Sequence, residues 1–161
     1  MTYSERRTGR KKGIRLRVTM TRMMPYDRDA PVIRVHSQAH AELALAAAAE
    51  CRRTIMLASA PGASANIGAG YFRAMIEAAR AVHPGARSLS VLDCGDRAGD
   101  VMGALREGLE AVCFNGDEAL GRKLAEIARQ GDAVLITEPL DGLDLALAAD
   151  PPGAARAYLG G

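Results

Sequence analysis

Three side chains that can do chemistry lie close together near the middle of the chain: Asp93, Cys94 and Asp96. A carboxylate can move protons as a general acid or base, and a thiolate can bind a metal ion or attack a substrate. Residues 89–93 form a short run rich in aliphatic side chains, and residues 98–109 carry apolar side chains at helical spacing. A strand that ends in polar groups and leads into a helix puts those groups at the carboxyl edge of a parallel sheet, where α/β proteins build their sites.

The same residues also have a purely structural interpretation. Asp96 can cap a helix that begins near Ala98, and Gly95 can allow a tight turn between strand and helix. Cys94 and Cys113 can be small core residues, as free cysteines usually are. Residue types alone therefore leave both interpretations open.

Five apolar segments of strand length alternate with segments of helical periodicity. We expect the strands at residues 32–35, 54–58, 89–93, 111–114 and 133–136. We expect the helical segments at residues 39–51, 72–79, 98–109 and 120–127, with two short pieces at 143–149 and 152–159. Such alternation with short connections implies right-handed crossovers and a parallel sheet. The expected fold class is α/β with five parallel βα units, as an open parallel sheet or as a partial, truncated TIM-barrel-like fold.

Length and composition narrow the class of protein. The chain has 161 residues, which fits one domain, and 48% of them are hydrophobic. Three cysteines without a CxxC or Cys/His pattern argue against a disulfide framework and a structural zinc site, and favour a reducing, cytoplasmic location. No apolar run approaches the roughly 20 residues that a membrane span needs, so we expect no membrane partner.

Residues 1–29 differ in composition from the expected α/β domain at residues 30–161. Positions 6 to 22 carry eight arginine and lysine residues, with Glu5 as the one acid before Asp27. Such a stretch can bind nucleic acid or another anionic surface. It can also be a disordered leader, or upstream sequence from a wrongly assigned start. We expect the disordered leader, and we expect nucleic acid as a partner only through this stretch.

Short motifs follow three of the expected strands in a fixed order. They read Ala60-Pro61-Gly62-Ala63, Leu92-Asp93-Cys94-Gly95-Asp96 and Phe114-Asn115-Gly116-Asp117, and Glu138 follows the fifth strand. In order, spacing and glycine positions these motifs resemble those of the class II (zinc-dependent) fructose-bisphosphate and tagatose-bisphosphate aldolases, which are TIM barrels. The resemblance extends from about residue 32 to about residue 138 and covers roughly the first five strands of that barrel.

The resemblance implies roles for individual residues. Asp93 stands at the family's catalytic acid/base position, and Cys94 replaces a histidine that binds zinc. The implied substrate-binding residues are Gly62, Ala63, Asp96, Asn115 and Glu138. We expect the chain to end before the parts of the barrel that supply the family's other zinc ligands and its phosphate loop. Among the histidines, His36 alone is expected at a strand end, where it can face a site.

These departures lead to a functional hypothesis. We expect a divergent, shortened class II aldolase-like protein without zinc aldolase activity, which acts as a small-molecule-binding or interaction module. No cofactor is expected, or zinc if the family's site is partly retained. The alternative is an active carbon–carbon lyase whose site is completed by oligomerisation, with Asp93 as acid/base and Cys94 as metal ligand or nucleophile. A homo-oligomer is expected in either case, because an incomplete barrel exposes strand edges.

Overall fold

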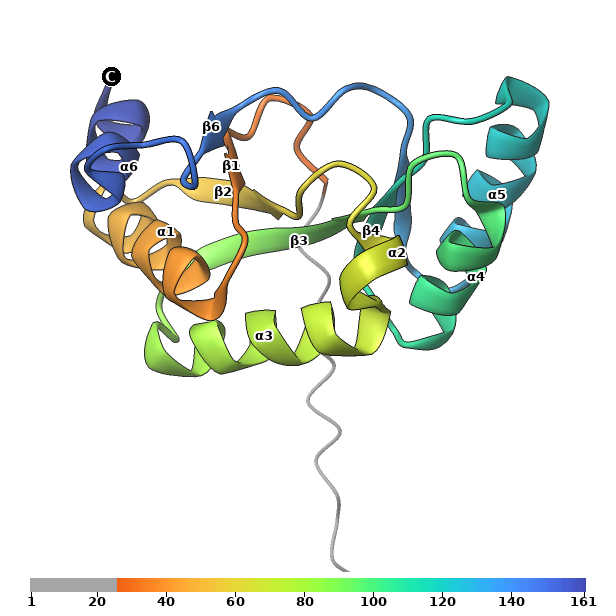
Figure 1. Ribbon diagram of the computed structural model, residues 1–161, viewed down its shortest axis with the longest axis horizontal. Helices are drawn as coiled ribbons and strands as arrows, with labels where there is room; N and C mark the ends of the chain where they lie inside the picture. Colours follow the sequence, from red (N-terminus) through yellow and green to blue (C-terminus); the bar gives the residue numbers. More distant parts are fainter. Residues whose placement is uncertain (1–25) are drawn as a thin grey trace, which may run out of the picture.

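The computed structural model describes residues 26–161, and Figure 1 shows a single curved sheet with helices packed around it. The strands are β1 (Val32–Arg34), β2 (Thr54–Ala58), β3 (Arg87–Asp93), β4 (Ala111–Cys113), β5 (Val134–Ile136) and β6 (Leu143–Asp144). The helices are α1 (Gln38–Glu50), α2 (Ser64–Ile67), α3 (Ala69–Val82), α4 (Ala98–Arg106), α5 (Glu118–Gln130) and α6 (Pro151–Gly160). None of these helices is long and apolar enough to cross a membrane.

The strand order is β5-β4-β3-β2-β1-β6, and every neighbouring pair is parallel. From β1 to β5, each strand lies beside the one before it in the sequence. Right-handed crossovers that all step in the same direction place their helices on the same face of the sheet. The prediction of an α/β fold with an open parallel sheet is therefore confirmed, and β6 lies beside β1 as an additional strand.

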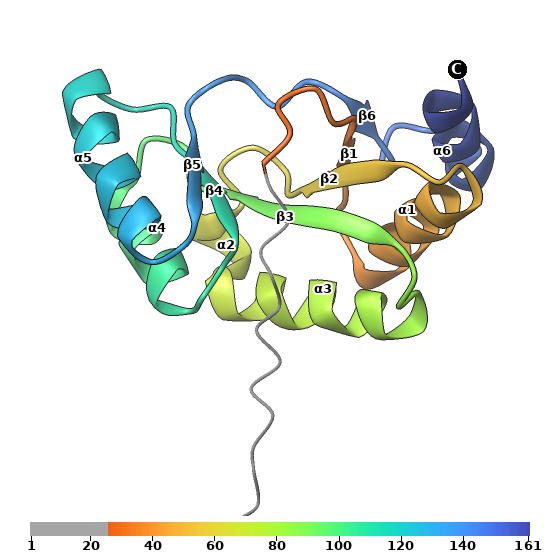
Figure 2. The same cartoon turned by 180° about the vertical axis from the view of Figure 1, so that it is seen from behind.

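The two faces of the sheet are covered by different parts of the chain. One face packs against the helices, and its core joins strand residues such as Leu57 and Leu92 to Phe72 of α3 and Leu159 of α6. The other face carries a second apolar cluster that Ala30 and Leu140 complete from connecting segments rather than from helices. Figures 1 and 2 show these segments crossing the sheet on the side away from the helices. Strands that are apolar on both faces are typical of a buried parallel sheet.

Side-chain caps begin α1, α5 and α6 but not α2, α3 or α4. The Ser37 side chain accepts a hydrogen bond from His40 N at 3.2 Å and so caps α1, and Asp117 caps α5 in the same way through Leu120 N at 2.8 Å. At α4 the capping position is Arg97, whose side chain makes no cap bond. The structural interpretation of Asp96 as a cap of α4 is therefore wrong.

The segment at residues 143–149 is not helical. Leu143 pairs with Ile33 and Asp144 with Arg34 as strand β6, and turns and bends follow up to residue 150. The helical prediction fails because the short run of apolar residues obtains its conformation from pairing with β1, a tertiary contact that local periodicity does not contain. The second short helical piece, at residues 152–159, is confirmed by α6.

Part of the predicted leader lies outside the described residues, which begin at Tyr26. Among its last four residues, Tyr26 and Arg28 contact the rest of the fold. Tyr26 packs on the second apolar cluster, and Arg28 Nη2 lies 2.8 Å from Glu138 Oε1. Ala30 N donates to Asp27 O at 3.2 Å and closes the turn that leads into β1.

Candidate functional site

Asp93, the last residue of β3, is the centre of the candidate site at the carboxyl edge of the sheet. Its side chain is buried, and Oδ1 accepts hydrogen bonds from Gly62 N and Gly95 N, both at 2.9 Å. Its own backbone N–H donates to Ser59 Oγ at 2.9 Å. Asp93 therefore joins the loop after β2 to the turn after β3.

Both glycines that contact Asp93 have the left-handed backbone that favours this residue type. The φ angle is +63° at Gly62 and +57° at Gly95. The two loops also approach each other closely, since a Cβ on Gly95 would lie 3.9 Å from Gly62 Cα. Local backbone geometry thus explains why glycine occupies both positions. It lets two backbone N–H groups converge on one carboxylate oxygen.

The other carboxylate oxygen of Asp93 is free to accept a ligand hydrogen bond. No hydrogen bond from residues 26–161 reaches Oδ2. Within the same residues, every buried side-chain nitrogen and oxygen has a hydrogen-bond partner, so Oδ2 must have contact with solvent. The result is a fixed acceptor at the sheet edge, with one oxygen used for structure and one available.

Arg97 supplies a positive charge to the two loops that Asp93 joins. Its Nη2 donates to Gly62 O at 2.7 Å and to Ser64 Oγ at 3.0 Å, and its Nε donates to Asp100 Oδ2 at 2.6 Å. The bond from Arg97, followed by the bond that Ser64 Oγ donates to Asp100 Oδ2 at 2.7 Å, holds the pKa of Asp100 below its usual range. Within the described chain, Nη1 makes no hydrogen bond, and it would lie 3.7 Å from a Cβ on Gly95.

Sequence reasoning missed Arg97. The loop after β2 contains no lysine or arginine, and the structure brings Arg97 to it from the turn after β3. The available signal was its position directly after Asp96, in the same turn as the predicted site residues.

Cys94 lies on the opposite face from Asp93. Its side chain is fully buried in the core between sheet and helices, and burial raises the pKa of its thiol to about 11. Among residues 26–161, no three His, Cys, Asp or Glu side chains are close enough to hold a metal ion. The described residues therefore do not fit the predicted zinc site, and we derive no chemistry through a metal.

The other predicted site residues are only partly brought together. Asn115 lies next to the Asp93 loop, because its backbone N–H donates to Gly95 O at 2.9 Å, and its side chain is exposed. Asp96 is exposed in the turn after β3. Ala63 is buried beside a small cavity of about 80 Å³. Glu138 is exposed and paired with Arg28 on the segment that crosses the second face.

His36, which was expected at a strand end, is paired at the carboxyl edge of β1 and β6. Its Nε2 lies 2.7 Å from Asp144 Oδ1, which also accepts a hydrogen bond from Ala146 N at 2.9 Å. The imidazole borders the same 80 Å³ cavity as Ser59 and Ala63. The His36–Asp144 pair therefore flanks the loop that Asp93 holds, at the same edge of the sheet.

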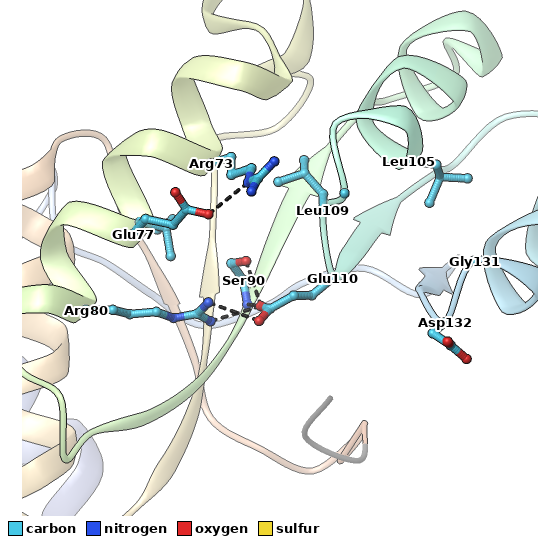
Figure 3. A pocket seen from close by; sticks show the side chains of 11 residues that line it. Arg73, Glu77, Arg80, Ser90, Leu105, Leu109, Glu110, Gly131 and Asp132 are labelled. Carbon is cyan, nitrogen blue, oxygen red and sulfur yellow. Dashed lines mark hydrogen bonds and ion pairs between the residues drawn. The ribbon is translucent and has the colours of Figure 1, made fainter. Parts of the chain in front are cut away.

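A larger cavity, of about 460 Å³, lies at the opposite, amino-terminal edge (Figure 3). Arg80 and Glu110 form a two-bonded ion pair there, with Nη1–Oε1 at 3.0 Å and Nη2–Oε2 at 2.9 Å. Glu110 Oε2 also accepts from Ser90 N at 3.0 Å and from Ser90 Oγ at 2.9 Å. The two charges neutralise each other, and their hydrogen bonds join α3 to β3 and to the start of β4. We therefore assign the pair a structural role.

Comparison with known proteins does not assign the chain to a family. No protein-family model matches it, and no curated protein matches it. The resemblance to the class II aldolases thus remains a prediction from the motifs, and the function must be argued from the geometry of the site.

Proposed function

We propose that the chain is a divergent class II aldolase-like protein without zinc aldolase activity, and that it binds a small molecule at the carboxyl edge of β2 and β3. The arrangement of Asp93 carries the proposal. Two backbone N–H groups fix Oδ1 and hold the carboxylate in one orientation, while Oδ2 remains free for a ligand. A prepositioned acceptor of this kind loses little conformational entropy when a ligand binds.

The neighbouring groups define the ligand class. Oδ2 of Asp93 accepts a hydroxyl proton, and the free Nη1 of Arg97 donates to an anionic oxygen. Both groups border the same pair of glycine loops. We therefore propose a small hydroxylated anion, with its hydroxyl on Asp93, its negative charge on Arg97 and the Asn115 amide at the rim.

The alternative, an active carbon–carbon lyase, has less support. Such an enzyme must stabilise a carbanion, through a metal ion or through a Schiff base on lysine. The described residues around Asp93 include no cluster of metal ligands, and the lysine among residues 26–161, Lys123, is exposed on α5. Asp93 can serve as an acid or base, but no described group beside it can stabilise the carbanion.

We also propose that the protein is a homo-oligomer. Strands β5 and β6 are the ends of the described sheet. Open strand edges expose unpaired backbone groups, and a second copy can cover them.

The binding proposal is tested by titrating the full chain with D-glycerate and with glycerol 3-phosphate and recording the amide spectrum by NMR. We expect saturable shifts at the Gly62 and Gly95 amides. Asp93→Asn and Arg97→Met should each weaken binding about tenfold or more, as expected for the loss of one charge-assisted hydrogen bond. Asp132→Asn, at the opposite edge, is the matched control and should not alter binding. The absence of shifts at both glycines with either compound at millimolar concentration, or binding that neither site variant weakens, would contradict the proposal.

A further inference from the structure

Strand β5 presents an unprotected edge at the end of the sheet, next to α5 (Figure 2). Two of its residues turn their backbone groups to β4: Val134 N donates to Glu110 O, and Ile136 O accepts from Phe114 N, both at 2.9 Å. Backbone direction alternates along a strand, so the N–H and C=O of Leu135 point away from the sheet. β5 is 3 residues long and contains neither charge nor proline, two of the features with which edge strands commonly prevent pairing.

We infer that β5 pairs antiparallel with β5 of a second copy of this chain, about a two-fold axis at Leu135. In this register, Leu135 N–H donates to Leu135 C=O of the other copy, and the reverse bond forms by symmetry. Thr137 N–H then reaches Ala133 C=O of the other copy. Ala133 N already donates to Ala128 O at 2.9 Å, whereas Thr137 N makes no hydrogen bond to the described residues. The free donors at this edge can therefore reach free acceptors of the other copy in this register.

A cavity of about 490 Å³ lies beside the same edge. Its apolar wall comes from Phe114, Ala125 and Leu135, and the exposed Thr137 borders it. A second copy that pairs through β5 places its own Ala133 opposite Thr137, beside this opening, and the residues that precede Ala133 extend over it. The pairing thus combines backbone hydrogen bonds with burial of apolar surface, as strand addition generally does.

The charges of α5 favour a second copy as the occupant. α5 packs against β5 and carries Glu118 in its first turn and Arg129 in its last turn. Antiparallel pairing turns the helix of the other copy end for end, so the Glu118 end of each helix approaches the Arg129 end of the other. Both side chains are exposed. Among the described residues, their ion pairs lie within α5, where Glu118 pairs with Arg122 and Arg129 pairs with Glu126. Opposite charges then meet on both sides of the two-fold axis.

This inference deepens the proposed homo-oligomer and is independent of the small-molecule site. Sedimentation equilibrium of the full chain measures the dimer dissociation constant. We expect Glu118→Arg and Arg129→Glu each to raise it about tenfold or more, because each places like charges together twice, and the double variant to return it close to the original value. Glu77→Arg on α3 is the matched control, since Glu77 is likewise exposed and paired four residues away with Arg73, and it should have no effect.

Amide hydrogen exchange provides a second measurement. We expect the Leu135 and Thr137 amides to exchange more slowly at high protein concentration than at low, while the Asp144 amide, which points away from β1 at the open edge of β6, shows no such dependence. A monomer at every concentration would overturn both this interface and the proposed homo-oligomer. A dimer that responds to none of the α5 charge variants, or that protects β6 and not β5, would overturn the interface alone. Ligand titration is a separate measurement, so the two proposals can fail separately.

Discussion

Asp93 holds Gly62 in place across 31 positions of sequence: its Oδ1 accepts the Gly62 N–H at 2.9 Å. The same oxygen accepts the Gly95 N–H, so one buried carboxylate fixes two loops at the carboxyl edge of the sheet. This arrangement makes Asp93 important for stability even in the absence of a ligand. Stability and binding must therefore be measured separately at this residue.

Asp93→Ala should destabilise the fold by about 2–4 kcal/mol. The substitution removes the acceptor of two part-buried backbone N–H groups, and leaving such donors unsatisfied costs about 1–3 kcal/mol each. Asp93→Asn keeps an oxygen that can accept and should lose less. Urea denaturation monitored by circular dichroism measures both changes, and Asp96→Ala, an exposed acid three positions away, should stay within about 0.5 kcal/mol of the parent. Equal effects at Asp93 and Asp96 would show that Oδ1 does not hold the loops.

Gly62→Ala should cost about 1–2 kcal/mol. The φ angle of +63° is unfavourable for a residue with a Cβ, whereas space is sufficient, since the nearest atom to the added Cβ is 3.7 Å away. Gly103→Ala should have the opposite effect, because Gly103 lies inside α4 and its added Cβ would have no atom within 4 Å outside the backbone of its own helix and its chain neighbours. Alanine there should stabilise the protein by about 0.5–1 kcal/mol through helix propensity. Thermal unfolding of the two variants should therefore shift in opposite directions, and a shift in the same direction would contradict the backbone argument.

Thiol chemistry tests the alternative role of Cys94 as a nucleophile. Burial raises the pKa of Cys94 to about 11 and that of Cys113 to about 12, so neither thiol forms much thiolate near neutral pH. With Ellman's reagent at pH 8, we expect the native protein to react at the partly exposed Cys51 and the unfolded protein to react at all three cysteines. Mass spectrometry after alkylation identifies the modified residue. Rapid native reaction at Cys94 would favour the nucleophile hypothesis.

The sheet could be predicted from the sequence because its signals are local. The apolar runs at β2 and β3, and the helix caps Ser37 and Asp117, are visible in single short segments. The two-residue strand β6 could not be found in this way, since Leu143 becomes a strand only by pairing with Ile33. Local patterns thus predict the parallel fold but not the position of its last strand.

The site shows the same division between local and long-range information. Asp93 was found from its motif, and the alternation of side chains along a strand already implies that its neighbour Cys94 points to the other face. A shared site for Asp93 and Cys94 could therefore have been questioned from the sequence. The contact of Arg97 with Gly62 could not be predicted, because it depends on the path of two loops that lie 35 positions apart.

The ion pair between Arg80 and Glu110 should make stability depend on pH in the acid range (Figure 3). Burial by itself raises the pKa of Glu110, but the hydrogen bond and the charge of Arg80, with the bonds from Ser90, outweigh it and lower the pKa below its ordinary value. A depressed pKa in the folded state means that this stabilisation is present at pH values above the unfolded pKa, about 4.3. It is lost as the pH falls through the lower pKa of the folded state.

Glu110→Gln should therefore destabilise the protein by about 2 kcal/mol at pH 7, since hydrogen bonds to a charged group contribute about 1.5–3 kcal/mol. The difference between parent and variant should stay constant from pH 7 to about pH 5 and shrink toward pH 3, because protonation removes the same charge from the parent. Urea denaturation at a series of pH values measures this difference. Glu77→Gln removes an exposed carboxylate of a surface ion pair and should change little at any of these pH values. If the Glu110→Gln difference were independent of pH down to 3, the carboxylate charge would not be what joins α3 to β3 and β4, and packing of the side chain would have to carry the contact.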